Sequence, residues 1–137
     1  MRALLFSLAA SLAAATAITP NADACFNAIQ PEVLGVSDHF GRGAFVVLDA
    51  PAPASVQWRQ LWPHSYDSTS IADAPALVAP VEVVLIGTSG TRSIKTSRVV
   101  YLRPAWGFDG KAHLALEVDL AKGERLMNAR LAGRMLM

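Results

Sequence analysis

The sequence has little cysteine, no long apolar run in its mature part and no recognisable catalytic spacing. A single cysteine, Cys25, stands among 137 residues, so no intrachain disulfide is possible and packing must hold the fold. Beyond the first 24 residues no segment is apolar over the length that a bilayer span requires. The net charge is +1 and no nucleic-acid recognition motif is present, so we expect neither a transmembrane span nor a nucleic-acid partner.

The first 24 residues are typical of an export signal. Arg2 supplies a positive start, residues 3–18 are rich in Ala and Leu, and residues 22–24 read Ala-Asp-Ala, the small-x-small pattern of a cleavage site. Cleavage of the 137-residue chain after residue 24 leaves 113 residues, which suits one domain. We therefore expect a signal peptide over 1–24 and a single domain over 25–137, in the periplasm or outside the cell.

Cys25 would be the first residue of the mature chain. A cysteine in this place raises a lipoprotein interpretation, in which its thiol carries the lipid anchor. The residue three positions earlier is Ala22, where a lipidated cysteine is usually preceded by leucine. Plain export with a free or intermolecularly paired thiol is therefore the default, and lipidation of Cys25 is the alternative.

Residues 97–132 predict consecutive antiparallel strands. Between His113 and Leu120 the pattern is that of a half-buried strand, with one face formed by Leu114, Leu116, Val118 and Leu120 and the other carrying His113, Glu117 and Asp119. Lys122-Gly123 then supplies a tight corner for a hairpin. The register predicted for this hairpin pairs Ala121 with Glu124, Val118 with Met127, Leu116 with Ala129 and Leu114 with Leu131. One face of the hairpin would then be wholly apolar.

Other segments carry strand signals of their own. β-branched and apolar residues fill Ala44–Leu48 and Val81–Ile86, and Asp109-Gly110 predicts a turn that joins a strand near Val99–Leu102 to the one at His113. Residues 56–62 suit either a strand or a helix. The polar stretch from Thr91 to Ser97 predicts a flexible loop or an exposed hairpin tip.

About six or seven short strands without a convincing long helix indicate an all-β fold, a small antiparallel β-sandwich of immunoglobulin-like size. An α+β ferredoxin-like fold is the alternative. It would require residues 54–62 or 122–137 to be helical, and the strand register of the second segment argues against that.

Charge is divided unevenly along the chain. Residues 25–88 carry two Arg or Lys against six Asp or Glu, whereas residues 89–137 carry nine against four. Such polarity suits head-to-tail association, an anionic ligand, or pairing between neighbouring strands of one chain. We favour pairing within the chain.

Neither a catalytic set nor a metal site is predicted. Ser, His and Asp are all present, but no spacing selects a triad. To bind a metal ion, His39, His64 and His113 would have to converge from three distant segments, with Asp38 or Asp67 as a further ligand. No cofactor motif is found. We interpret His113 as a residue of the solvent-facing strand side and His64 as a loop residue.

Two groups of side chains are candidate binding residues. The first is aromatic, Trp58, Trp62, His64 and Tyr66, and would stack on a sugar or cover an apolar patch of a partner. The second is cationic, Arg92, Lys95, Arg98 and Arg103, and would meet an anionic glycan, lipid headgroup or acidic surface. The structural alternatives are that both tryptophans belong to the core and that the cations protect a solvated sheet edge.

The sequence as a whole favours an exported, non-enzymatic binding or interaction module at the cell envelope. Its partner would be another protein or a second copy of itself, met through a sheet edge or the aromatic loop. A module that binds a glycan or an anionic lipid is the second hypothesis, and a small secreted hydrolase is the third. The hydrolase requires a concave pocket with a perturbed carboxylate or histidine.

Overall fold

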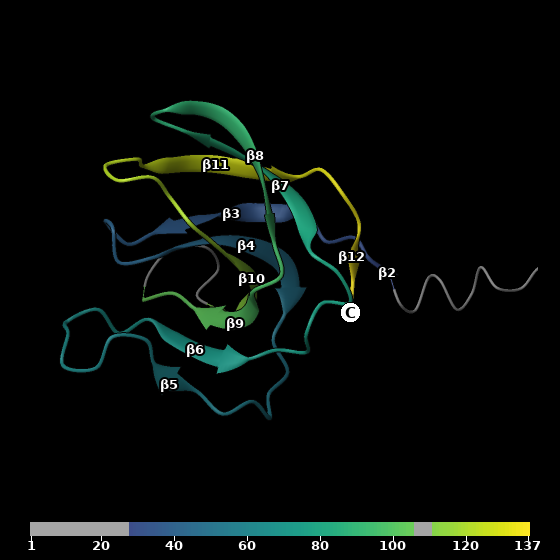
Figure 1. Ribbon diagram of the computed structural model, residues 1–137. Helices are drawn as coiled ribbons and strands as arrows, with labels where there is room; N and C mark the ends of the chain where they lie inside the picture. The colour runs from purple at the N-terminus through teal and green to yellow at the C-terminus, as the bar shows by residue number, and fades with distance from the viewer. Residues whose placement is uncertain (1–27, 106–110) are drawn as a thin grey trace, which may run out of the picture.

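A computed structural model of the chain describes residues 28–105 and 111–137, and within them it contains strands and no helix (Figure 1). The larger sheet has the order β3 (Val33–Asp38), β4 (Ala44–Pro51), β10 (His113–Val118), β9 (Val99–Arg103), β6 (Ser70–Asp73), β5 (Arg59–Gln60). The smaller sheet has the order β11 (Leu126–Leu131), β7 (Val81–Gly87), β8 (Gly90–Thr96), and β2 (Ala28–Ile29) pairs with β12 (Met135–Leu136). All these pairings are antiparallel, and the predicted all-β sandwich class is confirmed.

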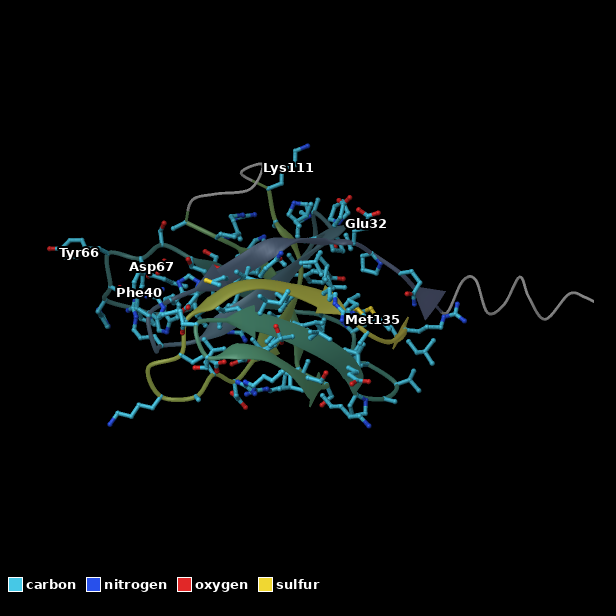
Figure 2. All side chains as sticks on the ribbon, turned by 90° about the horizontal axis from the view of Figure 1, so that it is seen from above. Glu32, Phe40, Tyr66, Asp67, Lys111 and Met135 are labelled. Carbon is cyan, nitrogen blue, oxygen red and sulfur yellow. The ribbon has the colours of Figure 1, made fainter. Side chains whose placement is uncertain are left out.

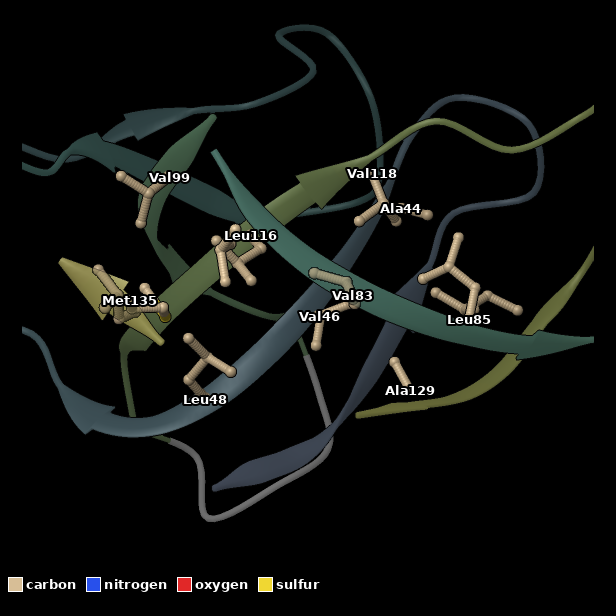
Figure 3. Packing of buried hydrophobic residues seen from close by; sticks show 13 residues of the cluster. Ala44, Val46, Leu48, Val83, Leu85, Val99, Leu116, Val118, Ala129 and Met135 are labelled. Carbon is tan, nitrogen blue, oxygen red and sulfur yellow. The ribbon is translucent and has the colours of Figure 1, made fainter. Parts of the chain in front are cut away.

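The main core lies between the two sheets (Figure 3). Alternate residues of β4 and β10 face alternate residues of β7 because side chains along a strand point to opposite faces. The central members, all less than about a tenth exposed, are Val46, Leu48, Leu114, Leu116, Val118, Val83, Leu85, Ala129 and Met135. Burial of a Val or Leu side chain stabilises the folded state by about 1.5–3 kcal/mol compared with leaving it exposed. With one cysteine in the chain, this apolar layer is the main source of stability.

The opposite face of the larger sheet is also covered. Phe45, Val47, Leu102 and Ala115 form a second buried cluster, with Leu61 packed against it from the segment before β6. Burial on both faces explains why Ala44–Leu48 is continuously apolar rather than alternating. It also corrects two expectations: β10 is buried on both faces rather than half-buried, and His113 is only 2% exposed rather than solvent-facing.

The predicted hairpin between residues 113 and 131 is wrong. β10 pairs with β4 and β9 in the larger sheet, whereas β11 pairs with β7 in the smaller one. Leu116 and Ala129 do meet in one core, but from facing sheets. Met127, which the predicted register placed opposite Val118, is 63% exposed. An alternating pattern fixes which face of a strand is buried and leaves its neighbour undetermined.

The turn expected at Lys122-Gly123 does form. Glu124 N–H donates to the carbonyl of Ala121 at 2.9 Å, and Gly123 has a φ of +80°, which residues with a side chain rarely adopt. The chain uses this turn to cross between sheets instead of folding back along β10. Its two ends diverge because Asp38 receives hydrogen bonds from residues 125 and 126 and draws them beside β3.

The structure also tests the predicted pairing of β9 with β10, the stretch from Thr91 and residues 56–62. β9 pairs with β10 as predicted, with Leu102 opposite His113, while the Asp109-Gly110 turn lies outside the described residues. For the stretch from Thr91, predicted to be a flexible loop or an exposed hairpin tip, the loop alternative is wrong, because residues up to Thr96 form the largely exposed strand β8 in a hairpin with β7. Of residues 56–62, only Arg59–Gln60 is in a strand.

Candidate functional site

Two loops meet at one end of the sandwich, the turn between β3 and β4 and the segment that leads into β6. The first is tight: His39 N–H donates to the carbonyl of Gly43 at 2.9 Å, and Phe40 lies in the left-handed region with a φ of 57°. Asp38 accepts the N–H of Phe40 at 3.0 Å, which stabilises this uncommon backbone conformation. The turn therefore holds the Phe40 side chain away from the sheets.

Side chains of the first loop bind Asp67 of the second. His39 Nδ1 lies 3.1 Å from Asp67 Oδ2, and the Arg42 guanidinium lies 3.5 Å from the same oxygen. Trp62 joins them, since its ring centroid is 4.5 Å from that of His39 and 4.3 Å from the Arg42 guanidinium carbon. These contacts fix the two loops relative to one another.

Asp67 is the buried anchor of this arrangement. Its Oδ1 accepts hydrogen bonds from the Thr69 hydroxyl at 2.6 Å and the Thr69 N–H at 2.9 Å. Burial acts to raise the pKa of the Asp67 carboxyl, but the hydrogen bonds from Thr69 and His39 outweigh it and leave the pKa below its ordinary value. The carboxylate is therefore ionised at neutral pH.

Two aromatic side chains project from this end into solvent. Phe40 is 78% exposed and Tyr66 is fully exposed, and Figure 2 places both beside Asp67 at the end of the molecule opposite Met135. The Arg125 guanidinium carbon lies 3.8 Å from the centroid of the Phe40 ring. We call Phe40, Arg42, Trp62 and Tyr66 the aromatic loop surface.

A groove of about 690 Å³ opens beside this surface. Its lining includes Ser37, His39 and Asp67 on one side, together with Phe40 and Tyr66. Another hollow, of about 540 Å³, lies between the β3–β4 turn and residues 117–125. Phe40 and Arg42 line both, so the aromatic loop surface separates two concave regions.

The predicted aromatic residues are not all brought together. Trp62 and Tyr66 lie at the aromatic loop surface, and His64 stands exposed between them with a φ of 67°. Trp58 instead contacts Arg103 of β9, whose guanidinium carbon is 4.2 Å from the Trp58 ring centroid. Both tryptophans are half-buried, so neither is a fully enclosed core residue.

The predicted cations are mostly engaged within the chain. Arg92 pairs with buried Glu124 at 2.7 Å, and Arg98 pairs with Asp119 at 2.8 Å. Lys95 lies opposite Glu82 in the β7–β8 ladder, and Arg103 covers Trp58. Carboxylates thus alternate with the cations, as expected from pairing between neighbouring strands.

Some ion pairs join the two oppositely charged parts of the sequence, and others lie within one part. Arg125 pairs with Asp38 at 2.9 Å and so links residues 89–137 to residues 25–88. Other ion pairs, such as Arg42 with Asp67 and Arg92 with Glu124, connect residues of the same part. The uneven charge distribution therefore does not by itself determine how the chain pairs.

Residues 28–105 and 111–137 contain neither a cluster of metal ligands nor a membrane-spanning helix. No three His, Cys, Asp or Glu side chains gather there in an arrangement that would hold a metal ion. No helix in that part is long and apolar enough to cross a bilayer. Cys25 and the expected signal peptide lie outside the described residues.

Replacing Trp62 and Tyr66 singly by alanine separates packing from surface roles. Trp62→Ala removes a half-buried ring that touches His39 and Arg42, so we expect a loss of about 1–3 kcal/mol in the free energy of unfolding. Tyr66→Ala is expected to change it by less than about 0.5 kcal/mol because the ring is fully exposed. Urea denaturation measures both, and equal losses would contradict this assignment.

Sequence reasoning did not assign Phe40 or Arg42 to the site, and it named Asp67 only as a possible metal ligand. The Gly41-Arg42-Gly43 segment indicates a turn, but no local signal says which distant loop that turn contacts. No protein-family model, curated protein or solved structure matches the chain. A function must therefore be argued from the geometry of the chain itself.

Proposed function

We propose that this protein is an exported interaction module of the cell envelope that binds a protein partner through its aromatic loop surface. The observation that carries the proposal is the pair of exposed rings, Phe40 and Tyr66, on loops that hydrogen bonds to Asp38 and Asp67 hold in place. Rigid exposed aromatic side chains are the usual anchors of protein interfaces, since they bury much area at low entropic cost. Export is proposed from the signal-like residues 1–24.

The charges at this surface favour an apolar protein contact over an anionic ligand. Arg42 is close to Asp67 and Arg125 is bound to Asp38, so each exposed guanidinium has a carboxylate partner in the same chain. An anionic lipid or glycan would have to compete with these carboxylates. The partner best suited to the surface is an apolar protein patch, on another protein or on a second copy of this chain.

A sugar-stacking site is less well supported. Stacking requires an open ring face, and the Trp62 ring has Arg42 over it and His39 against it. Trp58 is likewise covered by Arg103. Tyr66 alone of the predicted aromatic rings has a fully open face, which is a small platform for a sugar.

The double variant Phe40→Ala/Tyr66→Ala tests the proposal. Loss of two anchors, each worth at least about 1 kcal/mol, should weaken association about ten-fold or more. Light scattering of residues 25–137 over a concentration series measures association with a second copy, and formaldehyde cross-linking of whole cells followed by immunoblotting measures association with other proteins.

Val78→Ala is the matched control. Val78 is 72% exposed but lies beside β12, where its N–H donates to the carbonyl of Leu136. The control should retain every association that the wild type shows, and both variants should keep the wild-type melting temperature. Undiminished association of the double variant would refute the proposed surface.

A further inference from the structure

Ser37, His39 and Asp67 form a continuous chain of hydrogen bonds along one side of the groove. Ser37 Oγ lies 2.7 Å from His39 Nε2, and His39 Nδ1 lies 3.1 Å from Asp67 Oδ2. Ser37 lies near the end of β3, and His39 directly follows the strand. Side chains two positions apart along an extended backbone lie on the same face, so these two can meet. A local spacing and one distant carboxylate thus assemble the three groups.

The order of the groups determines how the protons are placed. Ionised Asp67 can only accept, so the proton of the hydrogen bond between it and His39 lies on Nδ1. Nε2 then has a free lone pair and accepts the hydroxyl proton of Ser37. This is the tautomer in which a histidine withdraws a proton from a serine while a carboxylate holds the ring in orientation.

The histidine ring is held by packing as well as by hydrogen bonds. Its centroid lies 4.5 Å from the Trp62 ring and 6.0 Å from the Phe45 ring, which meets it edge-on. Asp67 is in turn fixed by two hydrogen bonds from Thr69. A base held in one orientation avoids the entropic cost of finding it during a reaction.

We propose that Ser37 is a nucleophile that cleaves small carboxylic esters, with His39 as its general base and Asp67 as the residue that orients His39. Ser37 Oγ forms a bond to the ester carbonyl carbon while its proton passes to His39 Nε2. The C–O bond to the leaving alcohol then breaks, and the alcohol takes that proton. Water, deprotonated by His39, attacks the acyl-serine, and the carboxylic acid leaves as the proton returns to Ser37.

The groove indicates which esters fit. Its volume of about 690 Å³ suits a small molecule, and Phe40, Tyr66 and Pro104 offer apolar contacts to an acyl chain or aryl group. Arg42 lines the same groove, and its guanidinium, one nitrogen of which lies 3.5 Å from Asp67, has further N–H donors for negative charge on the carbonyl oxygen. The substrate class is therefore a short-chain or aryl ester without a bulky polar group.

This activity goes beyond the proposed protein binding and does not depend on it. The test uses residues 25–137 with two probes, a fluorophosphonate that forms a covalent adduct with activated serines and p-nitrophenyl butyrate as ester. Mass spectrometry of the labelled wild type should place the adduct on Ser37. Ser37→Ala should abolish labelling and lower ester hydrolysis about 10²-fold or more.

Two further variants distinguish a reactive chain from a structural one. Asp67→Asn keeps the side-chain shape but permits the wrong histidine tautomer, so labelling should slow strongly. Ser93→Ala, an exposed serine of β8, is the matched control and should label like the wild type. An adduct on another residue, no adduct, or equal hydrolysis by Ser37→Ala would overturn the proposal, and the wild-type labelling result holds even where a variant fails to fold.

Discussion

Replacement of Asp38 by alanine is expected to lower the free energy of unfolding by about 2–4 kcal/mol. The side chain of Asp38 is 6% exposed, and its Oδ2 accepts the N–H of Leu126 and the Nε–H of Arg125, both at 2.9 Å. Its Oδ1 accepts the N–H of Phe40. Alanine would leave two backbone donors without their acceptor and would remove the tie between β3 and the start of β11.

Asparagine at the same position supplies the comparison. Asp38→Asn retains a carbonyl oxygen that can accept one of these hydrogen bonds, so it should lose less stability than Asp38→Ala. Urea denaturation with a shared slope measures both. A loss below about 0.5 kcal/mol for Asp38→Ala would show that the tie between the sheets contributes nothing.

The contribution of the Asp38 carboxylate to stability should depend on pH. Burial acts to raise the pKa of Asp38, but hydrogen bonds from Arg125, Leu126 and Phe40 outweigh it and leave the pKa below its ordinary value. A carboxyl with a lowered folded-state pKa stabilises the fold fully above its unfolded-state pKa of about 3.9 and loses that contribution as the pH falls through the folded-state pKa. The stability lost by Asp38→Asn should therefore shrink progressively below about pH 4.

Gly87→Ala is the second substitution with a large expected effect. A Cβ atom at Gly87 would lie 2.5 Å from the carbonyl oxygen of Arg125. That oxygen belongs to the backbone and already accepts the N–H of Thr88 at 2.9 Å, so it cannot move away without losing a hydrogen bond. We expect a loss of about 2–4 kcal/mol, somewhat above the usual cost of overpacking.

Gly133→Ala is the matched control for this clash. The atoms nearest to a Cβ there belong to Glu82, at 3.8 Å and beyond, which is ordinary contact distance. The free energy of unfolding should change by less than about 1 kcal/mol, and any gain would come from the lower conformational entropy of the unfolded chain. Differential scanning calorimetry compares the two, and similar melting temperatures for both variants would contradict the close approach of β11 to Gly87.

The sequence predicts which segments of this protein are strands better than it predicts which strands pair with one another. The continuous apolar residues at Ala44–Leu48 reflect burial on both faces, and the mostly apolar segment His113–Val118 is also a strand, although both of its faces are buried. The partner of each strand depends on contacts far along the chain. Asp38 accepts hydrogen bonds from residues 125 and 126, which are 87 and 88 positions away. No residue near Lys122 indicates that contact in the sequence.

The candidate site is predictable only in part for the same reason. Trp62 and Tyr66 stand out in the sequence because large aromatic residues are few, at 7% of the chain. Phe40 looks like any turn-flanking apolar residue until its left-handed backbone is known. The chain from Ser37 through His39 to Asp67 joins residues 28 positions apart, so no spacing rule selects it from the other Ser, His and Asp residues.

Photo-cross-linking from position 66 tests the central claim, that the aromatic loop surface is where this protein meets a partner. A photoreactive phenylalanine analogue replaces Tyr66 in the full chain, and Val78 in a parallel sample, within the cells that produce the protein. Both positions are exposed, and they lie at opposite ends of the sandwich. We predict discrete protein adducts from position 66 and none from position 78, whereas no adduct from 66, or the same adducts from both, would contradict the claim.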